Sequence, residues 1–208
     1  MVTKESTRNL VLSNALTAVA ALIMHWPLAT LLWPYWIQSI IIGWYSRKRM
    51  LALTNFTTEG LTSNDQPVEA TPASLRSTAR FFVLHYGFFH FVYLIFLCQG
   101  AAKITPLDWL TFAGLAVSFA MSHGSSFRQN IAADRRGCPN LGVLLFLPYL
   151  RVIPMHLAIL FGGAVAGDSA GALLLFVALK TVADVAMHRA EHRLLQRGAS
   201  DEATAEER

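Results

Sequence analysis

RFFVLHYGFFHFVYLIF, residues 80–96, is an apolar run interrupted by two histidines. A helix needs about 20 mostly apolar residues to cross the roughly 30 Å hydrocarbon core of a bilayer, so we predict a transmembrane helix over about 79–98. The whole chain has the same character, because 54% of its 208 residues are hydrophobic and only 14% are charged. Soluble domains of this length are less apolar. The sequence therefore indicates a protein whose solvent is lipid.

Further apolar runs suit spanning helices, and we place these at about 9–25, 28–46, 107–123, 141–165 and 170–190. Between the first two we read a turn around His25, because their combined run is nearly twice one span and Pro27 and Pro34 interrupt it. The run at 141–165 contains Pro148 and Pro154, which predict a kink. The basic, apolar start of the chain also suits a signal peptide, but no small-x-small cleavage site precedes His25, so we expect a retained first helix.

Lysine and arginine predict the orientation, since short loops rich in these residues stay cytoplasmic. With six spans they share one side of the membrane: Lys4, Arg8, Arg47, Lys48, Arg49, Arg76, Arg80, Arg128, Arg135, Arg136, Arg189, Arg193 and Arg197. An odd number of spans would destroy this agreement. We therefore predict an all-α, polytopic membrane helix bundle with six transmembrane helices and both termini cytoplasmic, placed in a bacterial inner membrane.

We expect one domain over residues 1–197. The cytoplasmic loop at about 47–78 includes a polar, aperiodic stretch that predicts mobility, and residues 198–208 predict a disordered tail. Cys98 and Cys138 fall on opposite sides of the predicted membrane, which excludes a disulfide within one chain.

The formal net charge of +4 does not indicate a nucleic-acid partner, because such a protein needs a water-facing basic surface. The expected partner is the lipid bilayer, and a homo-oligomer is left open.

Ionisable side chains at membrane depth are costly, so they usually face a bundle interior and carry a function or a specific pairing. At about 1.5 Å of rise per helical residue, those of this chain crowd into the cytoplasmic half of the predicted bundle. We therefore expect an inward-facing polar cluster or cavity. Its candidate members are Gln38, His85, His90, His123, Arg151, His156, Lys180, Asp184 and His188.

The sharpest pattern lies in the last predicted span, where Lys180, Asp184 and His188 follow one another at intervals of four residues along one stripe. An Asp and a His four apart on a helix can bind a divalent transition metal such as zinc, with His90 and His156 completing the site from other helices. The alternative is that Lys180 and Asp184 neutralise each other and that His188 sits at the membrane interface. Proton or ion handling is a third interpretation.

Two details bear on these alternatives. His85 and His90 are about 140° apart around an ideal helix, so they would not both point at one ion, and each could simply bond to a neighbouring helix. Arg151 could bind the phosphate of a lipid or substrate, or pair with Asp184. We prefer the pairing.

Four blocks of the chain together resemble a bacterial family of integral membrane proteins known only as a domain of unknown function. They are YWIQSIIIGWYSRKRML at 35–51, RFFVLHYGFFHFVYLIF at 80–96, PYLRVIPMHLAILFGG at 148–163 and LKTVADVAMHRAEH at 179–192. The resemblance implies the helix-bundle fold and no activity. It also implies a Glu where this chain has Gln38, which removes a carboxylate from the cluster and weakens a proton-relay or metal role for that helix.

A second comparison is with membrane hydrolases of the ceramidase and adiponectin-receptor type, which place Ser, Asp and His around zinc. This chain contains residues of the same types: Ser122, His123, Asp184, His188 and His192. A zinc-bound water could attack an amide or ester, but Asp184 and His188 share a helix here and the order of the motifs is not reproduced. Enzyme, proton- or ion-coupled transporter and structural membrane subunit stay open as functions.

Overall fold

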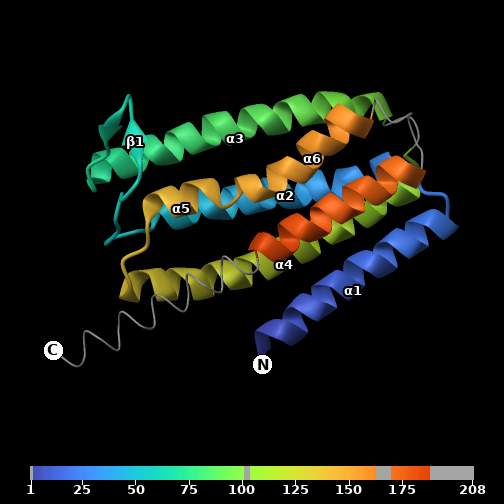
Figure 1. The fold of residues 1–208 in the computed structure, drawn as a ribbon, viewed down its shortest axis with the longest axis horizontal. Coiled ribbons are helices and arrows are strands. Elements are labelled where there is room, and N and C mark those ends of the chain that lie inside the picture. The colour runs from blue at the N-terminus through green and yellow to red at the C-terminus, as the bar shows by residue number, and fades with distance from the viewer. Residues whose placement is uncertain (1, 101–103, 163–169, 188–208) are drawn as a thin grey trace.

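The computed structural model describes residues 2–100, 104–162 and 170–187. These are mostly helical, in the order α1 (Val2–Ile23), α2 (Leu28–Leu51), α3 (Pro72–Gly100), α4 (Pro106–Arg136), α5 (Leu141–Phe146) and α6 (Tyr149–Gly162), with a further helix at Ala170–Met187. Two short strands, β1 (Thr62–Ser63) and β2 (Gln66–Pro67), pair antiparallel. The long helices run back and forth along one common direction (Figure 1). The all-α prediction is confirmed.

The turn between α1 and α2 explains why the long N-terminal run forms two helices. His25 has a left-handed φ of 52°, and the N–H of Trp26 donates to the carbonyl of Ala21 at 2.9 Å, which is the main bond of a Schellman motif. Pro27 follows with extended backbone, at ψ 148°, and α2 begins at Leu28. The two predicted helices are present, but Pro34 lies inside α2 and does not interrupt it.

Helix α4 is much longer than the predicted span of 107–123. Thr105 and Asp108 start it with a capping box, in which each side chain accepts the backbone N–H of the other residue, at 3.2 and 2.9 Å. It ends only at Arg136. Its last turns are held to α2 by a bidentate ion pair, because Arg49 donates to both carboxylate oxygens of Asp134 at 2.6 and 2.7 Å. The predicted helix end near His123 was therefore wrong.

The connection between α2 and α3 is folded and shorter than the predicted loop of about 47–78, because α2 continues to Leu51 and α3 begins at Pro72. The β1–β2 hairpin turns at Asn64 and Asp65, which both have positive φ values, of 50° and 60°. Positive φ at both central residues is the requirement of a type I′ hairpin turn. The aperiodic loop expected from composition therefore contains local structure of its own.

This connection is also attached to the start of α5. The N–H of Leu141 donates to the carbonyl of Thr57 at 2.8 Å, and the side-chain amide of Asn140 donates to the carbonyl of Glu59 at 2.9 Å. Asn140 also accepts the N–H of Val143 at 3.1 Å and so caps α5. The hairpin segment and α5 are thus one connected unit.

The predicted fifth span, about 141–165, is divided into α5 and α6 at Leu147 and Pro148. A proline inside a helix removes one backbone bond and clashes with the preceding turn, so the break agrees with the predicted kink. Pro154 lies inside α6 without ending it. The last predicted span, about 170–190, is described from Ala170 to Met187.

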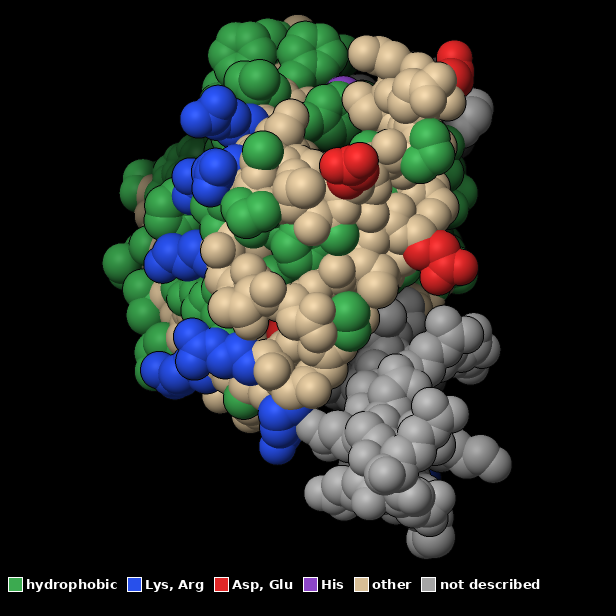
Figure 2. Space-filling model, turned by 90° about the vertical axis from the view of Figure 1, so that its left-hand side faces the viewer, with side chains coloured by type: hydrophobic (Ala, Val, Ile, Leu, Met, Phe, Trp, Pro, Cys, Tyr) green, Lys and Arg blue, Asp and Glu red, His purple; other side chains and the backbone are tan. Residues whose placement is uncertain are grey.

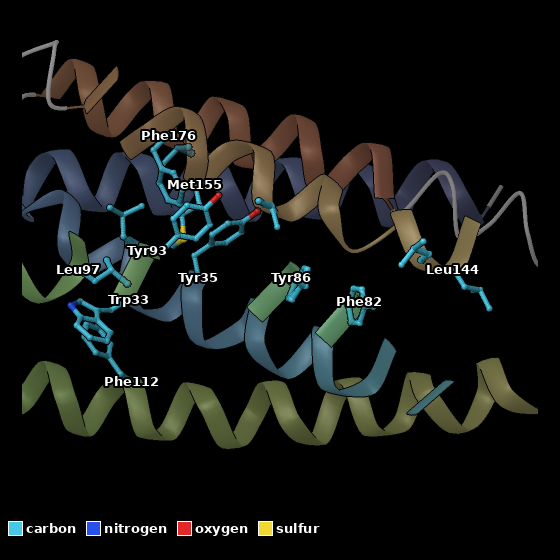
Figure 3. Close-up of a cluster of buried hydrophobic side chains, with 14 of the residues drawn as sticks. Trp33, Tyr35, Phe82, Tyr86, Tyr93, Leu97, Phe112, Leu144, Met155 and Phe176 are labelled. Atoms are coloured by element: carbon cyan, nitrogen blue, oxygen red, sulfur yellow. The ribbon is translucent and has the colours of Figure 1, made fainter. Parts of the chain in front are cut away.

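Helix α2 lies at the centre of the bundle and packs along both α3 and α4. The core is rich in aromatic side chains (Figure 3), with Tyr35 of α2 edge-on to Phe176 at a ring-centroid distance of 5.4 Å. Gly43 allows the closest approach of α3, because a Cβ there would lie 2.6 Å from the ring of Tyr86. Large rings on one helix facing small residues on the next fix how the helices pack.

The outer faces of the bundle are apolar. On α3, Leu84 is 74% exposed and Phe88 and Phe91 are each 62% exposed. Among the described residues, two helical stretches are long and apolar enough to cross a membrane by length and composition, Pro72–Gln99 and Ala170–Met187. Only 28% and 39% of their most apolar 18-residue windows are buried inside the protein. The structure thus gives two candidate spans where the sequence predicted six.

Basic side chains gather at the end of the bundle that carries the hairpin. Figure 2, viewed from this end, shows Lys and Arg side chains along one margin and Asp and Glu side chains on the opposite side. At this end, α2 and α4 finish and α3 and α5 start. Their basic residues near these ends are Arg47, Lys48, Arg49, Arg76, Arg80, Arg128, Arg135 and Arg136.

Candidate functional site

Asp184, on the helix Ala170–Met187, is only 7% exposed and is shared by two cations. The Nζ atom of Lys180 lies 2.5 Å from its Oδ2, and Nη2 of Arg151 lies 3.3 Å from its Oδ1. The four-residue spacing places Lys180 one turn before Asp184 on the same stripe, while Arg151 comes from α6. The charge pairing that the sequence offered as an alternative to a metal site is therefore present.

Helices α1 and α2 complete this cluster. The side chain of Asn14 accepts a hydrogen bond from Lys180 Nζ at 2.9 Å and donates one to Asp184 Oδ2 at 3.4 Å. The hydroxyl of Tyr35 donates to the backbone carbonyl of Arg151 at 3.0 Å, and its ring lies 5.7 Å from Lys180 Nζ. We call Asn14, Tyr35, Arg151, Lys180 and Asp184 the Asp184 cluster. Asn14 was missed by the sequence analysis, although a buried amide in an apolar helix was the available signal.

The Asp184 cluster has one positive charge in excess when its members are ionised, since two cations share one carboxylate. Within the described residues, Nε and Nη1 of Arg151 are buried and lack a hydrogen-bond partner, and Arg151 as a whole is 8% exposed. A buried charge without full compensation costs several kcal/mol (~3–5). Oδ1 of Asp184 is likewise buried without a hydrogen-bond partner, so the unsatisfied groups of the cluster include an acceptor as well as donors.

The predicted histidines of α3 and α6 are engaged in hydrogen bonds. His90, 2% exposed, bonds through Nδ1 to the backbone carbonyl one turn earlier at 2.8 Å. Nδ1 of His85 lies 2.9 Å from the hydroxyl of Tyr149, and Nδ1 of His156 lies 3.3 Å from the hydroxyl of Tyr93. The bonds of His85 and His156 join α3 to α6, as the packing interpretation expects, whereas the bond of His90 stays within α3.

The structure does not assemble the predicted metal ligands from the residues that it describes. In the described ranges, no three His, Cys, Asp or Glu side chains lie close enough together to hold a metal ion. His90, His156 and Asp184 consequently do not form such a group. The fourth predicted ligand, His188, lies outside the described residues, as does His192, so the metal site stays a prediction.

A pocket with a mixed apolar and polar lining lies between α2, α4, α5 and the end of the helix Ala170–Met187. Its polar lining consists of Tyr45, Ser46, Arg49, His123, Ser126 and Asn130. Arg49 is already paired with Asp134 through its two hydrogen bonds. The predicted cluster member Gln38 is half-buried on α2, and Ser122 is exposed on α4; neither lines this pocket.

The pocket and the Asp184 cluster are neighbours. His123, Ser126 and Asn130 are spaced three and four residues apart on α4, so they share one face of the helix. Pro148 and Met187 both line the pocket, and Arg151 and Asp184 lie three residues from them along the chain.

Comparisons with known proteins identify a family without an activity. Residues 2–201 match a family model described as "Family of unknown function (DUF6498)". No curated protein and no solved structure matches the chain.

Proposed function

The chain belongs to the DUF6498 family of unknown function, and from its own residues we propose a multi-pass membrane protein that couples proton movement to the passage of a solute. In this proposal six helices cross the inner membrane of a bacterial cell, with α5 and α6 forming one broken span, and the basic end faces the cytoplasm. Lys180 and Asp184 carry the proton-linked charge.

The membrane location is supported by the exposed apolar surface. Leu16 on α1, Leu84 on α3 and Leu110 on α4 are 62%, 74% and 71% exposed, and they lie on three different helices. Soluble monomers rarely expose contiguous apolar areas of this kind, because water hydrates them unfavourably. The basic residues at one end of the bundle agree with the excess of Lys and Arg in cytoplasmic loops.

The observation that carries the proton-coupled function is the sharing of one buried carboxylate by Lys180 and Arg151. A lysine is able to lose its proton, whereas an arginine stays charged. Loss of the Lys180 proton would leave Arg151 and Asp184 as a neutral pair, and its return would restore the excess positive charge. Lys180 is also the more accessible partner, since its side chain is 24% exposed and that of Asp184 is 7% exposed.

A structural role is the second candidate, and Asn14 is the observation that favours it. Its bonds to Lys180 and Asp184 connect α1 to the last described helix, and interhelical polar contacts of this kind hold helices together in a membrane. The two functions differ in what they require of Lys180: packing requires its charge and length, whereas proton coupling requires that it can lose a proton.

Proteoliposomes loaded with a pH-sensitive dye test this difference. Wild-type protein should move protons when an outward gradient of one of several small anions or amines is imposed. Lys180→Arg keeps the charge but cannot release a proton, so it should abolish the flux while leaving thermal stability close to that of the wild type. Lys48→Met, at an exposed lysine beside Trp44, is the control and should transport normally.

If no solute gradient moves protons through the wild-type protein, the transport proposal is wrong and the structural role is favoured. Flux that survives in Lys180→Arg would remove Lys180 as the proton carrier.

A further inference from the structure

Two helices connect the pocket to the buried ion pair within about one turn. Pro148 lines the pocket and Arg151 follows it by three residues, while Met187 lines the pocket and Asp184 precedes it by three residues. The backbone N–H of Arg151 donates to the carbonyl of Pro148 at 3.1 Å, which closes this turn. Three helical residues rise about 4.5 Å. The ion pair between Arg151 and Asp184 therefore lies one turn away from the pocket.

Ser39 of α2 lies at the same level. Tyr35, Ser39, Ile42 and Ser46 follow one another at helical intervals and share one face of α2. Tyr35 belongs to the Asp184 cluster, whereas Ile42 and Ser46 line the pocket. Ser39, which is 1% exposed, lies between them. This face of α2 thus continues from the pocket to the cluster through a buried hydroxyl group.

Each of these three residues has polar atoms without a hydrogen-bond partner in the described part of the chain. They are Oγ of Ser39, Nε and Nη1 of Arg151, and Oδ1 of Asp184. The set contains donors and acceptors, so an ion of either sign would satisfy only some of them. Water both donates and accepts, and a buried water typically bonds to about three such groups. Water is therefore the ligand that suits all three residues.

The polar part of the pocket lining also suits water. Arg49, in the last turn of α2, is paired with Asp134, so its charge is already balanced. Ser46, Ser126 and Asn130 add neutral groups that donate and accept hydrogen bonds. The space open to the centre of a water molecule is about 70 Å³, and about 10–15 Å³ of such space holds one water. The pocket therefore takes roughly five to seven waters.

Asp184 lies between Lys180 and the pocket, because the last described helix runs from Lys180 through Asp184 to its end at the pocket. Oδ2 of Asp184 accepts from Lys180 at 2.5 Å and from Asn14 at 3.4 Å. Oδ1 makes no hydrogen bond within the described residues. Arg151 and Tyr35 are the other ionisable groups that face this pair. One oxygen of the carboxylate thus holds the lysine, and the other is left for water.

We propose that the pocket is the cytoplasmic entrance of a water-filled passage that reaches Asp184 past Ser39 and Arg151, and that protons move between the cytoplasm and Lys180 through it. A proton that leaves Nζ of Lys180 passes to the carboxylate of Asp184. Asp184 then gives a proton to the nearest water, which restores the carboxylate and leaves the amine neutral. Ser39 is a positioning residue, since its hydroxyl holds water and takes up no charge. The inference rests on the proposed function for the movement of the proton, whereas water in the passage can be tested by itself.

Hydroxyl-radical labelling of the detergent-purified full chain is the first test, because radicals formed by X-ray radiolysis of water modify side chains beside internal water. Mass spectrometry gives the labelling rate of each residue. Tyr35 and Tyr93 are both 2% exposed, and Tyr35 shares its helix face with Ser39. Tyr35 should be labelled several-fold faster than Tyr93, which is the control. In Ser39→Ala, the rate at Tyr35 should fall toward that of Tyr93.

The rate of proton flux in proteoliposomes is the second test. Ser39→Ala should lower the flux by at least about tenfold, because a positioned group in a proton transfer typically contributes this much or more, and its thermal stability should stay close to that of the wild type. Ser118→Ala removes an exposed hydroxyl of α4 outside the pocket, so it should change neither the flux nor the labelling of Tyr35.

Equal labelling of Tyr35 and Tyr93 in the wild type would overturn the inference even if protons move, and so would full flux in Ser39→Ala. Faster labelling of Tyr35 without any flux in the wild type would instead leave the water-filled passage in place and reject the transport function.

Discussion

Removing the carboxylate of Asp184 should destabilise the protein far more than removing either of its cations. Asp184→Asn leaves Lys180 and Arg151 facing each other, and loss of one partner from a buried ion pair costs about 3–5 kcal/mol. Lys180→Met and Arg151→Met each leave a neutral pair with Asp184. Because one cation stays paired with the carboxylate in each variant, no uncompensated buried charge is left, and we expect each to cost below about 2 kcal/mol.

The order of stabilities can be measured as the free energy of unfolding. The purified protein is titrated with SDS while circular dichroism follows its helix content. Combining Asp184→Asn with Lys180→Met should recover part of the lost stability, because it removes one of the two opposed cations. The account of the cluster as a carboxylate shared by two charges would be refuted if Asp184→Asn were no more destabilising than Lys180→Met. It would also be refuted if the double variant were as unstable as the sum of the two single variants.

Two further predictions concern topology and packing. Cys98 and Cys138 are exposed free thiols, so a membrane-impermeant maleimide should label Cys138 only from the cytoplasmic side and Cys98 only from the opposite side; labelling of both from one side would contradict a single span, α4, between the two cysteines. Gly43→Ala should cost about 1–3 kcal/mol, since its Cβ would lie 2.6 Å from the buried ring of Tyr86. Gly87→Ala, which meets nothing within 4 Å, is the control and should leave thermal stability unchanged or slightly raised; equal losses at both glycines would show that close packing at α2 is not the cause.

The sequence predicted those parts of the structure that depend on neighbours along the chain. The pairing of Lys180 with Asp184 followed from their four-residue spacing on one helix, and the break between α5 and α6 followed from Pro148. The turn at His25 was predicted from the length of the apolar run and from Pro27. In each case the interaction that decides the structure joins residues close together along the chain, so it can be predicted from the sequence alone.

The parts that were missed depend on contacts between distant residues. Helix α4 continues past residue 123 into polar sequence, where its last turns are held by the ion pair between Arg49 and Asp134. Of the polar residues expected to cluster, His123 lines the pocket, beside Ser126 and Asn130 of α4, which the shorter predicted helix had placed in a loop. Asn14 joins the cluster across 166 residues of sequence from Lys180, and no local pattern encodes that contact.

The break at Leu147 and Pro148 separates a segment held by the hairpin connection from one held by α2 and α3. Helix α5 is tied to the hairpin connection through Thr57 and Asn140, whereas α6 starts afresh after Pro148, without a continuous ladder of backbone bonds from α5. Arg151 lies within the first turn after the break. The angle between the two segments therefore sets the separation of Arg151 from Asp184, and both break residues line the pocket. A molecule bound at the break would change this angle and, with it, the distance between Arg151 and Asp184.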